Sequence, residues 1–417
     1  DGDDGPWSSF SIQIGTPPQR SRLFASTRST SFWVPVPEGC TKDDPDDCGE
    51  NRGFLFNTGS STSWESKGLY ELETYEEAKL GLSGNGLYGF DSVTIGWPGD
   101  NGPTVSNQAI AGIATKDFYL GGIPLTPWAT NFTDIQNPFP SFLTTLKDNG
   151  SIPSISWGYT AGAYYNAPQV FGSLILGGYD LARIDPTKQQ VSLSLGSDVS
   201  REHLIAVQNI TFTSGSSPQN LAAASDGIFA NINTNVGGMW LPKPVCDRFA
   251  EAFGITFDNR TDLYLINDTQ HETLKQSNPS VTMQLGGSLI DALSTDIVLP
   301  YSSLALQAKS PFLKGSAGSE ARYLPIHVAP NNTAYTLGRV LLQHAYVFTD
   351  YERMNFTVAP ALLPGATNPT AEIVPIRVPG YVTTTKSSSL GGGAIAGIVI
   401  GVVAAITGVA LVFWFMY

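Results

Sequence analysis

The feature that most constrains the fold is an internal repeat of ten residues. The segment STRSTSFWVP, residues 26–35, aligns without a gap to NTNVGGMWLP, residues 233–242. Each copy has Thr second, Trp six residues later, then an aliphatic residue and Pro, and each follows an apolar run. Two copies about half a chain apart predict two similar lobes, each presenting a loop to a shared cleft. A chain of 417 residues is long enough for two lobes of ordinary domain size.

The body of the chain has the pattern of a mostly β protein. Short alternating apolar runs are separated by Gly, Pro, Asn and Asp, as in SFSIQI (9–14), SVTIGW (92–97), SLILGG (173–178) and VTMQL (281–285). Helical candidates are few: residues 139–150 end in Gly, and residues 243–254 have Pro near the start and Gly at the end. Many short strands with rare helices indicate a sandwich or barrel class.

The net charge of the chain and its glycosylation sequons indicate which partners are excluded and in which compartment the protein is expected. A net charge of −13 argues against nucleic acid or an anionic membrane surface as a partner. The number of N-x-S/T sequons indicates a glycoprotein of the secretory pathway or cell surface. The predicted glycosylation sites are Asn131, Asn149, Asn209, Asn259, Asn267, Asn331 and Asn355.

The three cysteines fit an oxidising compartment. Cys40 and Cys48 bracket the polar loop TKDDPDD, which suits a local disulfide. Cys246 has no evident partner, and we expect a buried free thiol there.

The C-terminal segment predicts a membrane anchor. Residues 391–417 contain no charged or strongly polar residue except Thr407, and this run is long enough to span hydrocarbon. The preceding TTTKSSSLGGG is typical of a flexible stalk. We expect a stalk over 377–393 and a single spanning helix over 394–417, with the N-terminal side outside or in the lumen. A glycolipid-anchor signal is the alternative, although LGGG is a poor polar spacer.

Several segments together resemble the pepsin-like aspartic proteases (peptidase A1), over nearly all of residues 7–361. FSIQIGTPPQ (10–19) is similar to the family's first strand and turn, after whose Gly the catalytic Asp follows by eleven residues. From Gly15 that position is Ser26, so LFASTRSTSFWVP (23–35) occupies the place of F-D-T-G-S-S-x-L-W-V-P. By the repeat, the second catalytic position is Asn233. Further similar segments are SGNGLYGFDSV (83–93) for the far strand of the flap hairpin, residues 139–159 and 172–180, and residues 335–361.

The resemblance implies a bilobal fold and a degenerate active site. We expect an N-terminal lobe over 1–183 and a C-terminal lobe over 184–376. LFNTGSSTSW (55–64) is one residue from the active-site motif, but the spacing places it on a surface strand and turn, so Asn57 is a decoy. Cys40 and Cys48 match the family's small disulfide loop. Fungal families with altered catalytic loops on a membrane stalk are the most similar in organisation.

The family's reaction requires two carboxylates that share one proton and activate water. Ser26 offers a hydroxyl and Asn233 an amide, and neither is a useful base. Thr27 and Thr234 match the threonines that brace the two loops. Arg28 and Asn235 replace the Gly after each Thr, where Gly is typical of close approach or positive φ, so we expect Arg28 to rearrange the loop and bring a cation toward the cleft.

The flap has no clear equivalent of the family's tip tyrosine. EAKLGLSG (77–84) offers Lys79 or Leu80 there, and Tyr75 fits only after a gap. The residues we therefore name as cleft candidates are Arg28, Lys79 and Asn235.

No replacement chemistry is evident, and no metal or other cofactor is expected. The four histidines, His203, His271, His327 and His344, lie at no metal-binding spacing, and each is by default a surface or satisfied core residue.

Three functions remain open. The first is a membrane-anchored, glycosylated pseudoprotease that binds a peptide, polysaccharide or protein. The second is an aspartic-type endopeptidase, although neither D-T-G nor D-S-G occurs in the chain. The third is a structural wall or adhesion module with a vestigial cleft. An open groove favours the first function, and a filled cleft favours the third.

Overall fold

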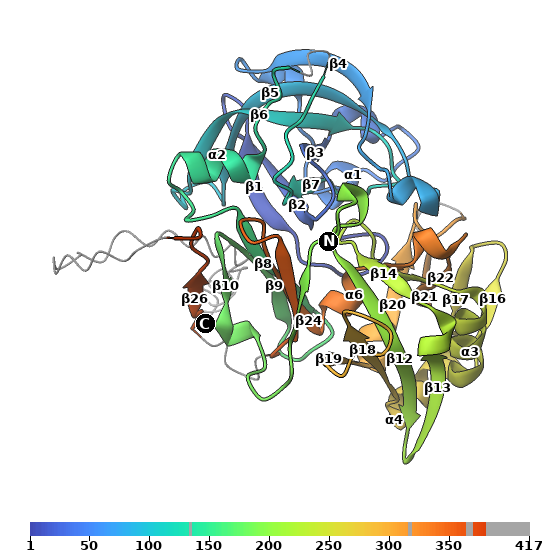
Figure 1. Cartoon of the computed structure of the whole chain (residues 1–417). Coiled ribbons are helices and arrows are strands. Elements are labelled where there is room, and N and C mark those ends of the chain that lie inside the picture. Colours follow the sequence, from blue (N-terminus) through green and yellow to red (C-terminus); the bar gives the residue numbers. More distant parts are fainter. Residues whose placement is uncertain (133–135, 316–318, 364–369, 381–417) are drawn as a thin grey trace, which may run out of the picture.

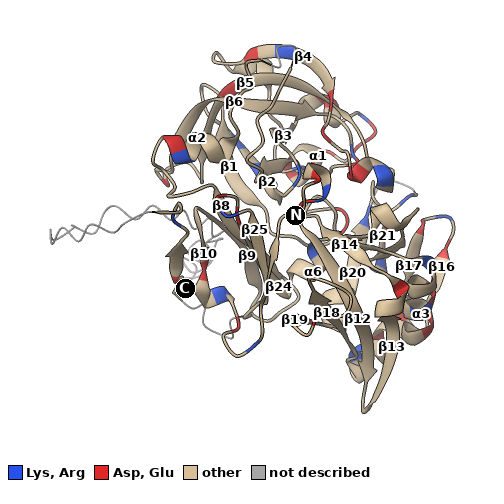
Figure 2. Ribbon diagram, in the orientation of Figure 1, with Lys and Arg blue, Asp and Glu red and all other residues tan. Residues whose placement is uncertain are grey.

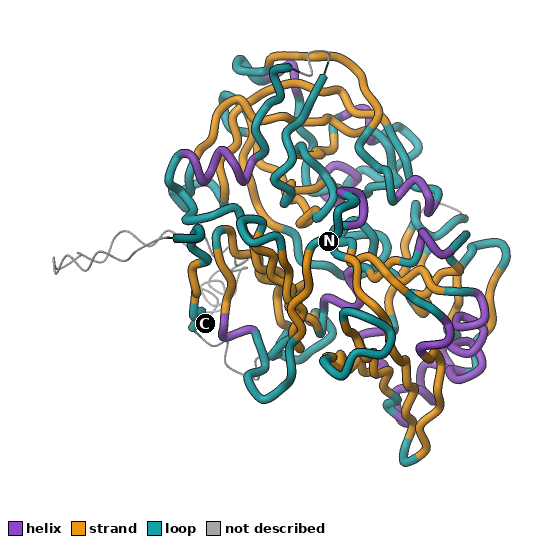
Figure 3. The backbone as a smooth tube through the Cα atoms, in the orientation of Figure 1, coloured by secondary structure: helices purple, strands orange, loops and turns teal. Residues whose placement is uncertain are grey.

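The computed structural model describes residues 1–132, 136–315, 319–363 and 370–380. These residues form a mostly β structure in which short helices lie at the margins of the sheets (Figure 1; Figure 3). The predicted class is therefore confirmed. The part of the predicted stalk beyond residue 380 and the predicted spanning helix lie outside the described residues. Within the described ranges, no helix combines the length and apolar character that crossing a bilayer requires.

The first third of the chain forms a seven-stranded sheet that curves toward a barrel. Its order is β1-β2-β7-β3-β6-β5-β4, and β1 also pairs with β5, which brings the two sides of the sheet together. The strands are β1 (Phe10–Ile14), β2 (Gln19–Ser26), β3 (Phe32–Pro35), β4 (Glu65–Glu71), β5 (Asn85–Ile95), β6 (Thr104–Ile113) and β7 (Gly122–Pro124).

The second half of the chain forms an eight-stranded sheet with a four-stranded sheet beside it. Seven strands follow the order β19-β18-β12-β14-β23-β15-β22, and β13 pairs with β12. They are β12 (Leu204–Ser214), β13 (Ser217–Ala223), β14 (Phe229–Ile232), β15 (Met239–Leu241), β18 (Ser280–Gly286), β19 (Ser294–Pro300), β22 (Ile326–Val328) and β23 (Thr336–Leu337). The smaller sheet contains β16 (Thr256–Asp258), β17 (Leu263–Leu265), β20 (Leu306–Lys309) and β21 (Glu320–Leu324).

A five-stranded sheet joins the two halves. Its order is β11-β25-β24-β8-β9, and the antiparallel β8–β24 pair connects strands from distant parts of the sequence (Figure 1). The strands are β8 (Ser156–Ala163), β9 (Val170–Leu176), β11 (Val191–Ser194), β24 (Ala345–Asp350) and β25 (Asn355–Pro360), and a separate pair is formed by β10 (Gly178–Asp180) and β26 (Ile373–Pro375). Buried side chains from all three large sheets belong to one apolar cluster.

The internal repeat corresponds to the same local topology in both halves. β2 pairs in parallel with β7, β7 pairs antiparallel with β3, and β3 pairs in parallel with β6. In the second half, β14, β23, β15 and β22 repeat this arrangement in the same order and sense. The repeat thus places residues 26–31 and 233–238 in equivalent loops. Glycines allow the close packing: a Cβ on Gly121 would lie 1.7 Å from the Trp33 carbonyl oxygen, and one on Gly338 2.3 Å from that of Gly238.

Helices occur where capping residues begin and end them. The two predicted helices are α2 (Phe142–Asp148), capped by the Ser141 hydroxyl, and α3 (Lys243–Phe253), which ends at Gly254 with φ of 65°. α4 (Asp268–Ser277) was not predicted, although its capping box, formed by Asn267 and Gln270, is visible in the sequence. The remaining helices are single turns: α1 (Cys48–Asn51), α5 (Tyr301–Leu304) and α6 (Arg339–Leu342).

The predicted states of the three cysteines and the predicted surface location of residues 55–64 are confirmed. Cys40 and Cys48 form a disulfide, and Cys246 is buried and unpaired. Asn57 is exposed, and its side chain caps a single 3₁₀ turn, Thr58–Ser60, by accepting from the Gly59 amide at 3.0 Å. The segment is thus a surface turn, although β4 begins only at Glu65 and the decoy itself contains no strand.

Charged residues lie mostly on loops and helices, and the interior strands carry few of them (Figure 2). The predicted glycosylation sites also lie toward the surface. Five of these asparagines are exposed, and Asn209 and Asn355 are half-buried. Their glycosylation stays a prediction.

Candidate functional site at the centre of the cleft

The two repeated loops are braced against each other by two threonines. The Thr27 amide donates to Thr234 Oγ1 at 2.9 Å, and the Thr234 amide donates to Thr27 Oγ1 at 3.2 Å. Both residues are buried, so these bonds are shielded from water. The braces place Ser26, at the end of β2, and Asn233, directly after β14, in equivalent positions of the two loops.

The Ser26 hydroxyl is held within its own loop. Its Oγ atom accepts from the Ser29 amide at 3.0 Å, the Ser29 hydroxyl at 2.8 Å and, more weakly, the Arg28 amide at 3.4 Å. Ser26 is fully buried. These are donors to Ser26 rather than bases, so nothing in these contacts would activate the hydroxyl as a nucleophile.

The Asn233 amide is bonded to two glutamates of another segment. Nδ2 donates to Glu77 Oε1 at 2.8 Å and to Glu76 Oε2 at 3.3 Å, and Oδ1 accepts from the Asn235 amide at 2.9 Å. Asn231 Nδ2 also donates to Glu76 Oε2, and Asn235 Nδ2 donates to Glu77 Oε1 at 2.9 Å. Asn231 lies in β14, Asn233 follows it directly and Asn235 lies in the next turn, and their three amides converge on one pair of carboxyl groups.

The two glutamates belong to the tip of the hairpin between β4 and β5, which we call the flap. The tip contains a 3₁₀ turn, Glu77–Leu80, that ends at Gly81 with φ of 83°. Glu76 is 1% exposed and Glu77 is fully buried, whereas Tyr75 is 72% exposed. The flap therefore buries its two carboxyl groups at the centre of the cleft and leaves its tyrosine exposed to solvent. Glu73 adds a further contact by accepting from the Thr30 amide at 3.0 Å.

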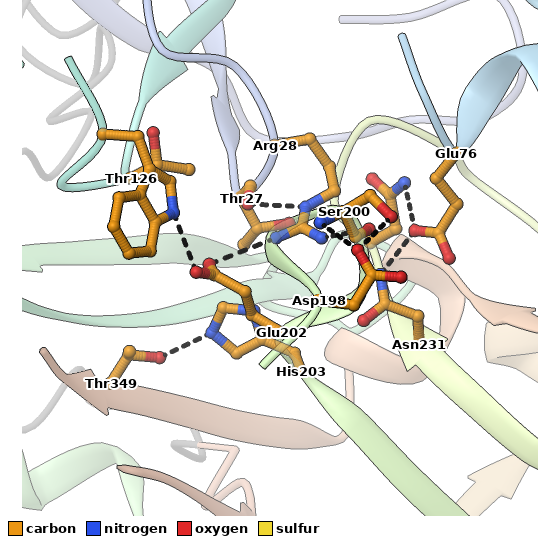
Figure 4. A network of polar contacts seen from close by, with 12 residues as sticks. Thr27, Arg28, Glu76, Thr126, Asp198, Ser200, Glu202, His203, Asn231 and Thr349 are labelled. Carbon is orange, nitrogen blue, oxygen red and sulfur yellow. Dashed lines mark hydrogen bonds and ion pairs between the residues drawn. The ribbon is translucent and has the colours of Figure 1, made fainter. Parts of the chain in front are cut away.

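Two arginines flank these carboxyl groups. Arg201 Nε lies 3.6 Å from Glu76 Oε1. Arg28 donates to the Ser200 carbonyl oxygen at 2.5 Å and to Glu202 Oε2 at 3.4 Å, so it crosses from one half of the molecule to the other. Figure 4 shows Arg28 reaching toward Glu202 while Glu76 faces Asn231. The expected cation near the cleft is thus present.

Burial changes the protonation behaviour of this cluster. It raises the pKa of Glu76 to about 7, with the neighbouring Glu77 acting in the same direction and Arg28 opposing it. Burial also raises the pKa of Glu202, which Arg28 and the Trp128 indole N–H partly offset. Burial lowers the pKa of His203 well below its ordinary value, and its Nε2 lies 2.9 Å from Thr349 Oγ1. His203 is therefore a neutral core residue, as the default interpretation expected.

The flap tip lies between two cavities of the cleft. One, of about 570 Å³, is lined by Leu80 and Leu82 of the flap and by aromatic side chains that include Phe118, Trp240 and Phe312. The other, of about 240 Å³, is lined by Tyr75, Glu76 and Glu77 together with Arg28 and Trp128. The centre of the cleft is filled by the protein itself, and space remains on both sides.

The structure brings together most of the predicted site residues. Arg28 and Asn235 lie at the centre of the cleft, but Lys79 lines neither of these cavities and instead helps to lower the pKa of Asp198. Arg28 and Asn235 stand where Gly is typical of the family, and neither has a positive φ, so both are held in ordinary backbone conformations.

Sequence reasoning missed Glu76, Glu77, Asn231, Arg201 and Glu202. The only local signals were the alternation N-x-N-x-N at 231–235 and two adjacent acids in the flap tip. Among the described residues, no group of His, Cys, Asp and Glu is arranged to hold a metal ion.

A pepsin-like β structure with two equivalent loops braced by reciprocal threonine bonds defines an aspartic-protease-like protein. The family model described as eukaryotic aspartyl protease matches residues 9–361. The chain belongs to this family.

Similar curated proteins bear protease names. The probable aspartic-type endopeptidase opsB of Aspergillus oryzae is 23% identical over 360 residues, covering 84% of this chain and 67% of that protein. Pepsin B of Canis lupus familiaris is 25% identical over 355 residues, covering 81% of this chain and 77% of that protein. Aspartic proteinase 3 of Saccharomyces cerevisiae is 22% identical over 352 residues, covering 80% of this chain and 56% of that protein.

Proposed function

We propose that this chain is a membrane-anchored cell-surface glycoprotein that uses the aspartic protease fold to bind a ligand and does not hydrolyse peptide bonds. The observation that carries the proposal is the bonding of Asn233. Where the reaction needs a carboxylate, an amide donates to the flap, and the opposite position holds a hydroxyl enclosed by its own loop. General acid–base assistance worth about 10²–10⁴ in rate has no residue to supply it at either position.

The alternative is an endopeptidase, as the names of the relatives suggest. It is favoured by one observation: two carboxyl groups do lie at the centre of the cleft, and burial raises the pKa of Glu76 to about 7. However, both are fully buried against amides, so they occupy the space that a scissile bond would need. The ligand-binding proposal explains this arrangement better.

A structural module with a vestigial cleft is the third candidate. The filled centre favours it, and the two flanking cavities favour a binding role. We prefer binding because pockets of about 300–1,000 Å³ are the usual size for ligand sites, and the larger cavity lies in that range.

The test is proteolysis by the full chain. Unfolded casein is incubated with the purified protein from acidic to neutral pH, beside a matched variant that carries Glu76→Gln and Glu77→Gln in addition to Ser26→Ala and Asn233→Ala. We expect no cleavage above that of the variant. Cleavage that the variant lacks contradicts the proposal, whereas equal cleavage in both preparations identifies a contaminating protease.

A further inference from the structure

We propose that the centre of the cleft is a binding site for the carboxylate side chains of an acidic peptide segment, and that Glu76 and Glu77 of the flap occupy this site in the closed state. The inference rests on the proposed non-proteolytic function and names the class of ligand.

The donors at the site match carboxylates. The side-chain nitrogens of Asn231, Asn233 and Asn235 all donate to glutamate oxygens, and each donor comes from the second half of the chain. Arg201 adds positive charge on the same side, and Arg28 adds it from the first loop. A group of amide and guanidinium donors accommodates a carboxyl group, which presents several acceptor oxygens.

The contacts between the flap glutamates and this site leave several buried polar atoms without a hydrogen bond. Glu76 Oε1 and Glu77 Oε2 are buried without a hydrogen-bond partner in the described part of the chain, and so is Arg201 Nε. Glu76 Oε1 and Arg201 Nε are separated by 3.6 Å, too far for a hydrogen bond. A segment free of the constraint of a hairpin can place its carboxylates closer to these donors, so an external ligand can compete with the flap.

The geometry of the cleft favours a peptide over other anions. The present occupant is itself a peptide with two successive glutamates, so the spacing of the donors already fits such a chain. The cavities on either side, of about 570 and 240 Å³, continue the cleft from the donor site and can accept neighbouring residues. The aromatic side chains of Phe118, Trp240 and Phe312 suit apolar residues next to the acidic pair. The net charge of −13 opposes a long polyanion such as a nucleic acid.

The experiment uses the full chain with an emptied flap, carrying Glu76→Ala and Glu77→Ala, at about pH 5, below the raised pKa of a carboxyl in this site. The probe is a fluorescent peptide with the flap sequence TYEEAK, residues 74–79, and the matched control peptide is TYQQAK. Binding is measured by fluorescence anisotropy. We expect the acidic peptide to bind at least about tenfold more tightly than its amide counterpart.

Two further substitutions test the position of the site. Asn233→Asp, added to the emptied flap, places a negative charge among the donors and should abolish the preference for the acidic peptide. Asn57→Asp makes the same change on the surface and should leave the preference intact. If the double alanine variant lacks a cooperative thermal transition, the experiment uses Glu76→Ser with Glu77→Ser, which retains polar groups in the flap but removes both long side chains from the site.

The outcomes separate this inference from the proposed function. Equal affinity for the two peptides, no binding of either, or equal effects of the two Asn→Asp changes would overturn the carboxylate site and leave the non-proteolytic proposal intact. Preferential binding of an oligogalacturonate over the acidic peptide overturns the peptide assignment. Cleavage of casein by the native chain that the control variant lacks contradicts the proposed function whatever the peptides do.

Discussion

Closure of the flap should weaken as the pH rises, because closure buries Glu76. The pKa of this carboxyl is raised from an ordinary 4.5 to about 7 in the closed state, chiefly by desolvation. In an open flap the carboxyl is in water and titrates near its ordinary value. The closed state therefore holds the proton more tightly, and linkage makes closure most favourable where Glu76 is protonated in both states.

The magnitude follows from the shift. Closure has its full stability below about pH 4.5 and loses stability progressively as the pH rises through about 7, above which the loss levels off at ~3 kcal/mol, or on the order of 100-fold in the open-to-closed ratio. The charged groups that face Glu76 are Arg28 and Arg201, which favour its ionised form, and Glu77, which opposes it. The shifted pKa already includes the effect of these arginines.

The assay is hydrogen exchange of the amides in residues 72–84, expressed as protection factors at about pH 5 and about pH 8, so that the intrinsic pH dependence of exchange cancels. We expect protection in this segment to fall by well over tenfold at the higher pH, while strands of the central sheet change little. Glu76→Gln preserves an acceptor for Asn231 and removes the titration, so its protection should no longer depend on pH. A pH dependence that persists in Glu76→Gln, or equal protection of the native flap at both pH values, would refute the reasoning.

Three other predictions follow from the contacts around the cleft. Thr27→Val removes the hydroxyl that accepts from the Thr234 amide and leaves that buried amide unpaired, so the free energy of unfolding should fall by about 1–3 kcal/mol, measured by denaturant titration; no change contradicts the bracing role. Replacing Cys40 and Cys48 by Ser opens a short loop and should lower the free energy of unfolding by about 2–3 kcal/mol without altering peptide binding. Asn57→Asp completes the string F-D-T-G-S-S but should yield no pepstatin-sensitive activity, because the turn lies on the surface; appearance of such activity disproves the alignment of Ser26.

Much of the fold could be predicted because it depends on local patterns. Alternating apolar runs correspond to β1, β5, β9 and β18, and the decamer repeat corresponds to equivalent strand arrangements in the two halves. α4 was missed because its apolar pattern is weak, although Asn267 and Gln270 form a capping box that the sequence displays.

The site was predicted only where a motif defines it. Ser26, Asn233 and the two threonines were located by the resemblance to the family's motif, its spacing from Gly15 and the internal repeat. Glu76 was not, because adjacent glutamates ordinarily remain in water, and its burial depends on Asn231, which is 155 residues away in sequence. The cation at Arg28 was predicted, but its partners were not, because Ser200 and Glu202 belong to the other half of the chain.

The membrane and surface predictions have their own test. The segment 394–417 has 24 residues, which at about 1.5 Å per residue is long enough to cross a bilayer with some tilt. We expect the full chain to resist both carbonate extraction and a phospholipase specific for glycolipid anchors. Release of the intact protein by the phospholipase would replace the spanning helix by a lipid anchor.

The most direct measurement of the central claim is a calorimetric titration of the full chain with pepstatin at acidic pH. This inhibitor places a hydroxyl between the two carboxyl groups of an active aspartic protease. Because the equivalent positions hold the Ser26 hydroxyl and the Asn233 amide, and the flap fills the space between the cavities, we predict no detectable heat of binding. Tight binding with one pepstatin per chain would contradict the account, since it requires an open cleft with a functional pair of acids.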